Sequence, residues 1–432
     1  MAIDGITALT RFGLGPRLGQ TPPTGPRGWL REQLTGTDPM ASVPGPSVGD
    51  GMIALREDRR NPVPAGTPTR GHAIWDAERL RLITGLVTSD APFRERLVWF
   101  WLNHFTISLR RGEITSMAGA YVREAIRPNV TARFVDMLMA VMTHPAMLFY
   151  LDNQTSVGPG SKVGQQPRPG QAARGLNENL ARECLELHTV SPAAGYTQAD
   201  VTAAARMLTG WSVDFDAVVL GFRFRPGTHE PGAQTVMGRT FPAGQEGGVA
   251  MLTWLGTHPA TYAHIARKLV AHFACDPAPP AAVEAVTRVL SASGGDLGAA
   301  SATLIELPAC WSGQLLRTPL DYVAAVARAI DEKPDLRLAN VIGALGQPIM
   351  GAPLPNGWSD RAEDWDDGEA LLRRVDWTWS LAARKPDLDP NNVLDTVLGS
   401  RADDRLRETV RRAGSRQEAL ALLLASPAMM RR

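Results

Sequence analysis

The chain of 432 residues, 44% of them hydrophobic, is long enough to bury a large core, so we expect one large unit or two closely packed domains. Its 45 basic and 44 acidic residues give a formal net charge of +1. That balance leaves no overall field to attract nucleic acid or an anionic membrane, so neither is an expected partner.

The cysteines and the first residues bear on the compartment. Cysteines at positions 184, 275 and 310 show no CxxC spacing, which argues against a disulfide framework and a cysteine-based zinc site. Segment 1–20 has no basic stretch followed by an apolar one, and no apolar run approaches about 18 residues. We therefore expect a cytoplasmic protein without a membrane span or a signal of its own.

Helical periodicity dominates the first part of the chain. Helices are predicted over 29–34, 72–87, 92–105, 116–127 and 131–143. A Gly/Pro/Ser-rich linker is predicted over 36–51. The strongest amphipathic pattern places four residues on one stripe, namely Phe93, Leu97, Trp101 and His104.

A loop and a β-hairpin interrupt this pattern. The segment 153–175 is rich in Gly, Pro, Gln and Ser, and either a lid or a disordered insertion fits that composition. Thr197 and Asp200 resemble an N-terminal capping arrangement for a helix that ends near Leu208. Alternating apolar residues, including Val219, then predict a β-hairpin near 211–225.

Helices return in the second half of the chain. They are predicted over 248–255, 259–273, 280–292, 297–307, 319–331, 336–345, 369–383, 403–413 and 416–424. The fold class is therefore mainly α, a multi-helical globular assembly with one small β-hairpin. We expect one compact unit made of an N-terminal helical part, a flexible loop, a central helical part and a C-terminal helical part, over 1–152, 153–175, 176–346 and 347–432.

The segment 177–188, NENLARECLELH, has a higher density of charged, amide and imidazole side chains than any other window. At about 100° per residue its charged side chains share one arc, whereas His188 falls on the apolar arc. One interpretation is a solvated face with i, i+4 ion pairs and a last-turn histidine favoured by the helix dipole. The other is a metal or acid/base site, which requires the helix to unwind near Leu187.

Four further residues carry two interpretations each. His104 is either a satisfied core histidine or a ligand or base, because its stripe points inward. His229 lies in a turn-rich loop and is either an ordinary surface histidine or a displayed catalytic group. Trp358 and Trp365 flank a Pro/Gly-rich loop and either lock it to the core or stack on a sugar ring.

Several motifs together resemble the uncharacterised bacterial DUF-eighteen-hundred family over nearly the full length of the chain. They are RFGLGP at 11–16, WFWLNHF at 99–105, NENLARECLELHT at 177–189, GYTQADV at 195–201, ARMLTGW at 205–211, the His229 loop through TVMG at 235–238, and Gly357-Trp358 with Trp365. The resemblance implies a mainly helical protein without an established activity or cofactor.

The resemblance also implies a setting. Many members carry export signals and are encoded beside a sulfatase-like family whose proteins often bear twin-arginine signals. Because this chain lacks a recognisable signal, it either stays in the cytoplasm or reaches the periplasm folded, bound to such a sulfatase-like twin-arginine-exported partner.

The leading hypothesis is a hydrolase that acts on a cell-envelope or polysaccharide substrate. The motifs are rich in Arg, Glu, His and Asn, a mixture that a purely structural scaffold does not need. The expected catalytic residues are Arg182, Glu183, Glu186, His188 and Arg206. The expected metal ligands, for zinc, iron or manganese, are His104, Glu183, Glu186, His188 and His229.

Two alternatives from other classes stay open. In the first, the chain is a non-enzymatic scaffold for the sulfatase-like protein, and the polar cluster is a buried structural network. In the second, Trp358 and Trp365 bind carbohydrate without catalysis.

Overall fold

The computed structural model describes residues 4–64, 66–166, 175–215 and 220–432, and it confirms a mainly helical fold. In the first half of the chain the helices are α1 (Gly5–Arg11), α2 (Pro26–Thr35), α3 (Val48–Arg60), α4 (Arg70–Thr88), α5 (Pro92–His104), α6 (Ala118–Tyr121), α7 (Phe134–Thr143), α8 (Pro145–Tyr150), α9 (Asn179–Glu183) and α10 (Gln198–Leu208). Two π-helical segments continue α6 and α9, namely η2 (Val122–Ile126) and η5 (Cys184–His188).

The second half of the chain contains the helices α11 to α22. They are α11 (Gln245–Gly256), α12 (Pro259–Phe273), α13 (Pro280–Ser293), α14 (Leu297–Glu306), α15 (Pro308–Trp311), α16 (Pro319–Ala329), α17 (Leu336–Ala344), α18 (Gly368–Ala382), α19 (Pro390–Val397), α20 (Asp404–Arg412), α21 (Arg416–Leu424) and α22 (Pro427–Met430). Single 3-10 turns lie between them, at Gly112–Ile114, Arg127–Asn129, Asn153–Thr155, Pro192–Ala194, Pro226–Thr228, Ala362–Asp364 and Gly399–Arg401.

Side-chain caps start many of these helices. The predicted cap of α10 is a capping box, in which the Thr197 hydroxyl accepts from the Asp200 N–H and the Asp200 carboxylate accepts from the Thr197 N–H. Ser47 and Asp50 form the same box on α3, so the predicted linker over 36–51 ends at Ser47. Helix α3 was not predicted from the sequence because its first turn contains glycine, which has a low helix propensity. A Cβ on Gly51 would lie 2.4 Å from the Ser116 carbonyl oxygen, so glycine allows this close packing.

The predicted β-hairpin is present as β1 (Trp211–Asp214) paired antiparallel with β2 (Gly221–Phe224). Its connection, including Val219, lies outside the described residues. A second hairpin, β3 (Gln234–Val236) with β4 (Arg239–Phe241), was not predicted because three residues per strand are too few for a periodic signal.

The described part of the predicted loop over 153–175 bonds to the chain that follows β2. The N–H groups of Gly158 and Val163 donate to the carbonyls of Thr228 and Gly227, and the Gly160 N–H donates to the Glu230 carboxylate. Residues 167–174 of this loop lie outside the described part. Among the described helices, none has the length and apolarity needed to cross a membrane.

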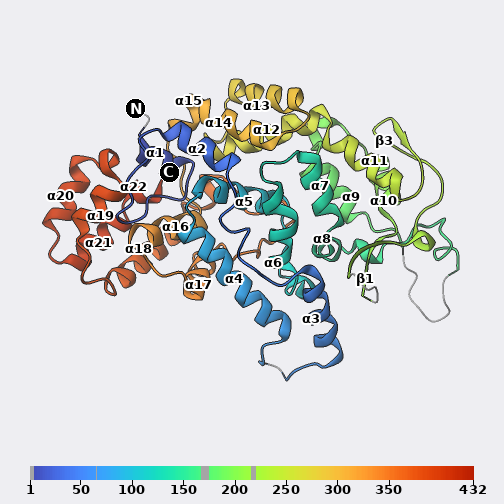
Figure 1. Cartoon of the computed structure of the whole chain (residues 1–432), viewed down its shortest axis with the longest axis horizontal. Helices are drawn as coiled ribbons and strands as arrows, with labels where there is room; N and C mark the ends of the chain where they lie inside the picture. The colour runs from blue at the N-terminus through green and yellow to red at the C-terminus, as the bar shows by residue number, and fades with distance from the viewer. Residues whose placement is uncertain (1–3, 65, 167–174, 216–219) are drawn as a thin grey trace.

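One connected set of buried apolar residues extends from Ala8 near the start to Met430 near the end. Helix α5 lies at the centre of the molecule, with α18 to α21 at one end and α9 to α11 with the hairpins at the other (Figure 1). The predicted stripe of α5 is buried, since Phe93, Leu97 and Trp101 are fully inaccessible. Helices α5 and α12 supply side chains to both clusters described next.

Candidate functional site

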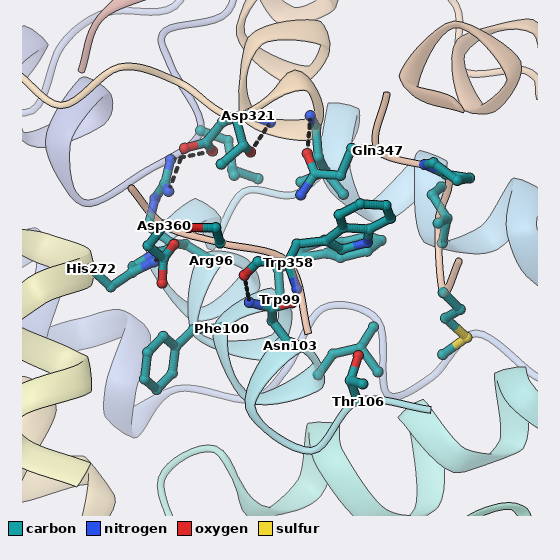
Figure 2. A pocket seen from close by; sticks show the side chains of 18 residues that line it. Arg96, Trp99, Phe100, Asn103, Thr106, His272, Asp321, Gln347, Trp358 and Asp360 are labelled. Carbon is teal, nitrogen blue, oxygen red and sulfur yellow. Dashed lines mark hydrogen bonds and ion pairs between the residues drawn. The ribbon is translucent and has the colours of Figure 1, made fainter. Parts of the chain in front are cut away.

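A cavity lies where α5, the last turn of α12, the first turn of α16 and the segment 347–360 meet. Figure 2 shows its lining, with an ion pair on one side, an imidazole and a carboxylate beside it, and two indoles opposite. The polar and aromatic lining residues are Arg96, Trp99, Phe100, Asn103, Thr106, His272, Thr318, Asp321, Gln347, Trp358, Ser359 and Asp360. The C-terminal segment therefore closes a site that the central helices begin.

His272 and Asp360 form a hydrogen-bonded dyad in this cavity. The two atoms Nδ1 of His272 and Oδ1 of Asp360 are 2.9 Å apart, while Nε2 is buried and has no hydrogen-bond partner among the described residues. Burial lowers the pKa of His272, and the nearby Asp360 carboxylate offsets this only in part. Burial raises the pKa of Asp360, but His272 and Arg432 lower it by more. The net effect is a pKa below the ordinary value, so the carboxylate is ionised. Because a carboxylate only accepts, Nδ1 donates and Nε2 carries the lone pair.

Two tryptophans form the aromatic wall, and an asparagine fixes one of them. The Asn103 side-chain amide donates to the Trp358 carbonyl and accepts from the Trp358 N–H, both at 2.7 Å. A Cβ on Gly357 would lie 2.5 Å from the Asn103 carbonyl oxygen, and the φ of Gly357 is +77°, so only glycine fits there. Trp99 projects its indole from α5, and its buried Nε1 has no partner within the described ranges of the chain.

Gln347 connects the segment 347–360 to the start of α16. Its side-chain oxygen accepts from the Leu320 N–H at 2.8 Å, which satisfies a free donor of the first turn. Its Nε2 then extends toward the indoles of Trp99 and Trp358 (Figure 2). The cavity therefore presents an amide N–H and an indole N–H on the side opposite the imidazole.

A buried ion cluster supports the opposite wall. Arg96 donates from both terminal nitrogens to Asp321, at 2.9 and 2.7 Å, and from Nε to the Gly13 carbonyl. Arg432 Nε lies 3.0 Å from the second Asp321 oxygen. Burial raises the pKa of Asp321, but Arg96 and Arg432 lower it well below its usual range. Asp321 therefore stays ionised and cannot donate a proton.

The predicted acidic helix forms, and its last turn is wide. Residues Cys184–His188 are π-helical, so the helix around Leu187 is wider than an α-helix. Arg182 donates to Glu178 at 2.9 Å, which is the i, i+4 pair of the solvated-face interpretation. Burial and Glu186 raise the pKa of Glu183, yet neither carboxylate has His188 among its charged neighbours.

His188 and His104 meet in a separate, fully buried cluster. Their ring centroids are 6.1 Å apart, and His104 Nε2 lies 3.2 Å from the His188 carbonyl oxygen. His264 Nε2 lies 3.1 Å from the Leu187 carbonyl oxygen, so two imidazoles cap the free carbonyls at the end of η5. Burial and the Lys268 charge lower the pKa of His188 to about 3 and that of His264 to about 4. These imidazoles are therefore neutral at physiological pH.

The other predicted residues lie elsewhere. Both nitrogens of His229 are bonded, Nδ1 at 2.8 Å from the Thr209 carbonyl oxygen and Nε2 accepting from the Gly244 N–H at 2.8 Å. Arg206 is half-buried on α10, and no other described residue bonds to its Nε. Within the described residues no three His, Cys, Asp or Glu side chains stand in an arrangement that would hold a metal ion. The expected ligand set is thus divided between the imidazole cluster, the acidic face and the His229 loop.

Comparison with known proteins places the chain in a family. The model of a family described as protein of unknown function, DUF1800, matches residues 7–431. The chain belongs to the DUF1800 family. No curated protein and no solved structure matches it. The quoted motifs of this DUF1800 chain include Asn103, Gly357 and Trp358, which meet at the cavity.

Sequence reasoning missed His272 and Asp360 in this DUF1800 protein. Both lie outside dense polar windows, and they are far apart in the chain. One signal was available, because His264, Lys268 and His272 recur every four residues and so share one face of the predicted helix over 259–273. Of the two tryptophans, Trp365 is buried and its Nε1 donates to the Ser359 carbonyl at 2.8 Å, which locks the loop, whereas Trp358 lines the cavity.

Proposed function

We propose that this protein is a hydrolase that cleaves an ester bond of a carbohydrate-containing, cell-envelope or polysaccharide substrate, with His272 as general base. One observation carries the proposal: His272 Nε2, in an aromatic-walled cavity, has no partner in the part of the chain that the structure describes, and Nδ1 is held by Asp360. A neutral imidazole oriented by a carboxylate is a common arrangement for removing a proton from an attacking oxygen.

In the proposed reaction, Nε2 of His272 takes a proton from water as the water oxygen attacks the ester carbonyl carbon. The carbonyl oxygen gains negative charge, and the N–H groups of Trp99 and Gln347 in the opposite wall are the proposed donors that stabilise it. The intermediate then collapses, the bond to the alcohol oxygen breaks, and that oxygen takes the proton back from His272. The products are a carboxylic acid and an alcohol, and Asp360 stays ionised throughout.

The charge states favour ester over glycoside hydrolysis. Glycoside hydrolysis commonly needs a carboxylic acid that donates a proton to the leaving oxygen. Both carboxylates of the cavity have lowered pKa values, Asp321 because of Arg96 and Arg432, and Asp360 because of His272. The apolar faces of Trp99 and Trp358 suit the C–H face of a sugar ring.

The test is turnover of chromogenic acetate esters and acetylated saccharides by the wild-type protein and by His272→Asn. We expect the variant to lose at least about a hundredfold in kcat, as for other general bases, with unchanged far-UV circular dichroism. His72→Asn, at an exposed histidine near the start of α4 and outside the cavity, is the matched control and should keep the activity. Equal turnover by His272→Asn and wild type, or no turnover of any ester, would contradict the proposal.

A second candidate function is binding to a sulfatase-like exported partner, and one surface feature favours it. Leu372, Val375 and Trp379 are 64, 41 and 50% exposed and follow one another along α18. Such a contiguous apolar stripe is typical of protein interfaces. Co-purification of the partner with wild type but not with Trp379→Ser, and recovery of both from the periplasm, is the expected result. Recovery of all of the protein in the cytosol with the partner present would contradict it.

A further inference from the structure

The charges around the cavity do not balance on the Asp321 side. Asp321 interacts with three buried guanidinium groups, those of Arg96, Arg432 and Arg317, and Asp360 also acts on Arg432. Arg317 donates from Nε to the Met429 carbonyl at 3.1 Å, while its buried Nη1 has no partner among the residues that the structure describes. Burial lowers the pKa of Arg317 to about 9, and Asp321 offsets this only in part. Arg317 is still protonated at neutral pH, so this wall carries an excess of positive charge.

The Asp360 side has no spare negative charge either. Lys268 lies one turn before His272 on the same face of α12 and is half-buried. Among the described residues its ammonium group has no hydrogen bond or ion pair within contact distance. Asp360 is the carboxylate that acts on it, at longer range. Asp360 is itself bonded to the neutral His272, so one carboxylate faces one ammonium group across the dyad.

The two sides together set four cationic side chains against two carboxylates: Arg96 lines the cavity, and Arg317, Arg432 and Lys268 lie behind its lining. A second observation is independent of this count. The Trp99 Nε1–H is a buried unpartnered donor in the cavity wall, and the Gln347 amide N–H extends toward the same space (Figure 2). Excess positive potential and free donors both favour a ligand with negatively charged oxygen atoms, because a partly buried site screens charge less than water does.

We propose that the saccharide substrate of the proposed hydrolase carries an acidic group, a carboxylate, sulfate or phosphate, and that Lys268 and Arg317 supply the positive potential that selects it. This inference rests on the proposed function only for the location of the substrate. Lys268 acts as a specificity-determining residue through its charge, and His272 remains the base.

The experiment measures binding to His272→Asn protein by tryptophan fluorescence, so that hydrolysis plays no part. The probes are matched pairs, namely trigalacturonate with its methyl ester, and galactose 6-sulfate and galactose 6-phosphate with galactose. We expect at least one charged probe to bind about tenfold more tightly than its neutral partner at low ionic strength, with the preference shrinking at high salt. The pair with the greatest preference identifies the acidic group.

Adding Lys268→Met should reduce the preference severalfold without changing the affinity for the neutral probe, whereas Lys268→Arg should keep it. Lys385→Met is the matched control, because Lys385 pairs with Glu332 at 2.8 Å away from the cavity. Lack of preference in all pairs, including lack of any binding, would overturn the inference, as would an unchanged preference in Lys268→Met. Charge-selective binding without esterase activity would overturn the proposed function alone.

Discussion

Replacing Asp321 by Asn tests whether the ion cluster behind the cavity is held together by that carboxylate. In the wild type the two charged Asp321 oxygens lie 2.7 to 3.0 Å from nitrogens of Arg96 and Arg432. The substitution replaces these oxygens by one amide oxygen and leaves the guanidinium groups of Arg96, Arg432 and Arg317 buried. Removing one partner of a buried ion pair costs about 3 to 5 kcal/mol. That is a large share of the roughly 5 to 15 kcal/mol by which natural domains are stable.

The assay is urea unfolding followed by tryptophan fluorescence, at neutral pH and in acid. The folded-state pKa of Asp321 is lower than its ordinary 3.8, so its stabilisation is present above that value and is lost as the pH falls through the folded-state pKa. The difference in the free energy of unfolding between wild type and Asp321→Asn should therefore be largest at neutral pH and should decrease in acid. Glu284→Gln, which breaks an exposed pair with Arg288, is the control and should change little. A loss below about 1 kcal/mol in Asp321→Asn at neutral pH would refute the reasoning.

Three further outcomes follow from the same geometry. Esterase activity should rise with pH through a transition below 6.5 and then level off, because burial lowers the pKa of His272 and only the neutral imidazole is a base; a profile that falls over this range would contradict the assignment. Asp360→Asn should lower kcat by about a hundredfold or more with little change in KM, measured by steady-state kinetics, because the dyad loses its orienting charge. Glu183→Gln should leave the thermal midpoint equal or higher at neutral pH, since burial and Glu186 raise the Glu183 pKa and so make the charged form destabilising; a marked drop in a calorimetric scan would show that the carboxylate stabilises the fold.

The helical elements were predictable where periodicity and end signals agree. The helix over 259–273 has Pro259 in its first turn and a regular apolar face, and α12 has these bounds. Helix α19 was not predicted, because eight residues give little periodic signal and its start depends on the Asp389 side chain accepting from the Asn391 N–H. Short helices are specified by single caps and by the surfaces they pack against, and a pattern search does not register these.

The candidate site was harder to predict than the fold, for a physical reason. The site was predicted in the segment 177–188 because its polar residues are close together in sequence. Such closeness favours local ion pairs, such as that of Arg182 with Glu178. The cavity instead joins His272 to Asp360, which is 88 positions further along the chain. Only tertiary packing brings such residues together, so their spacing carried no signal.

Helix α5 shows how one element supports both clusters. His104 lies on its buried stripe and bonds to the end of η5, whereas Asn103, the preceding residue, points to the cavity and fixes Trp358. Helix α12 repeats the division, with His264 bonded to the Leu187 carbonyl and His272 in the dyad. Since buried packing leaves little freedom to rotate either helix, the imidazole cluster fixes the orientation from which Asn103 and His272 reach the cavity. Within the motif at 177–189, the carbonyl groups of Leu187 and His188 thus contact the two helices that reach the cavity.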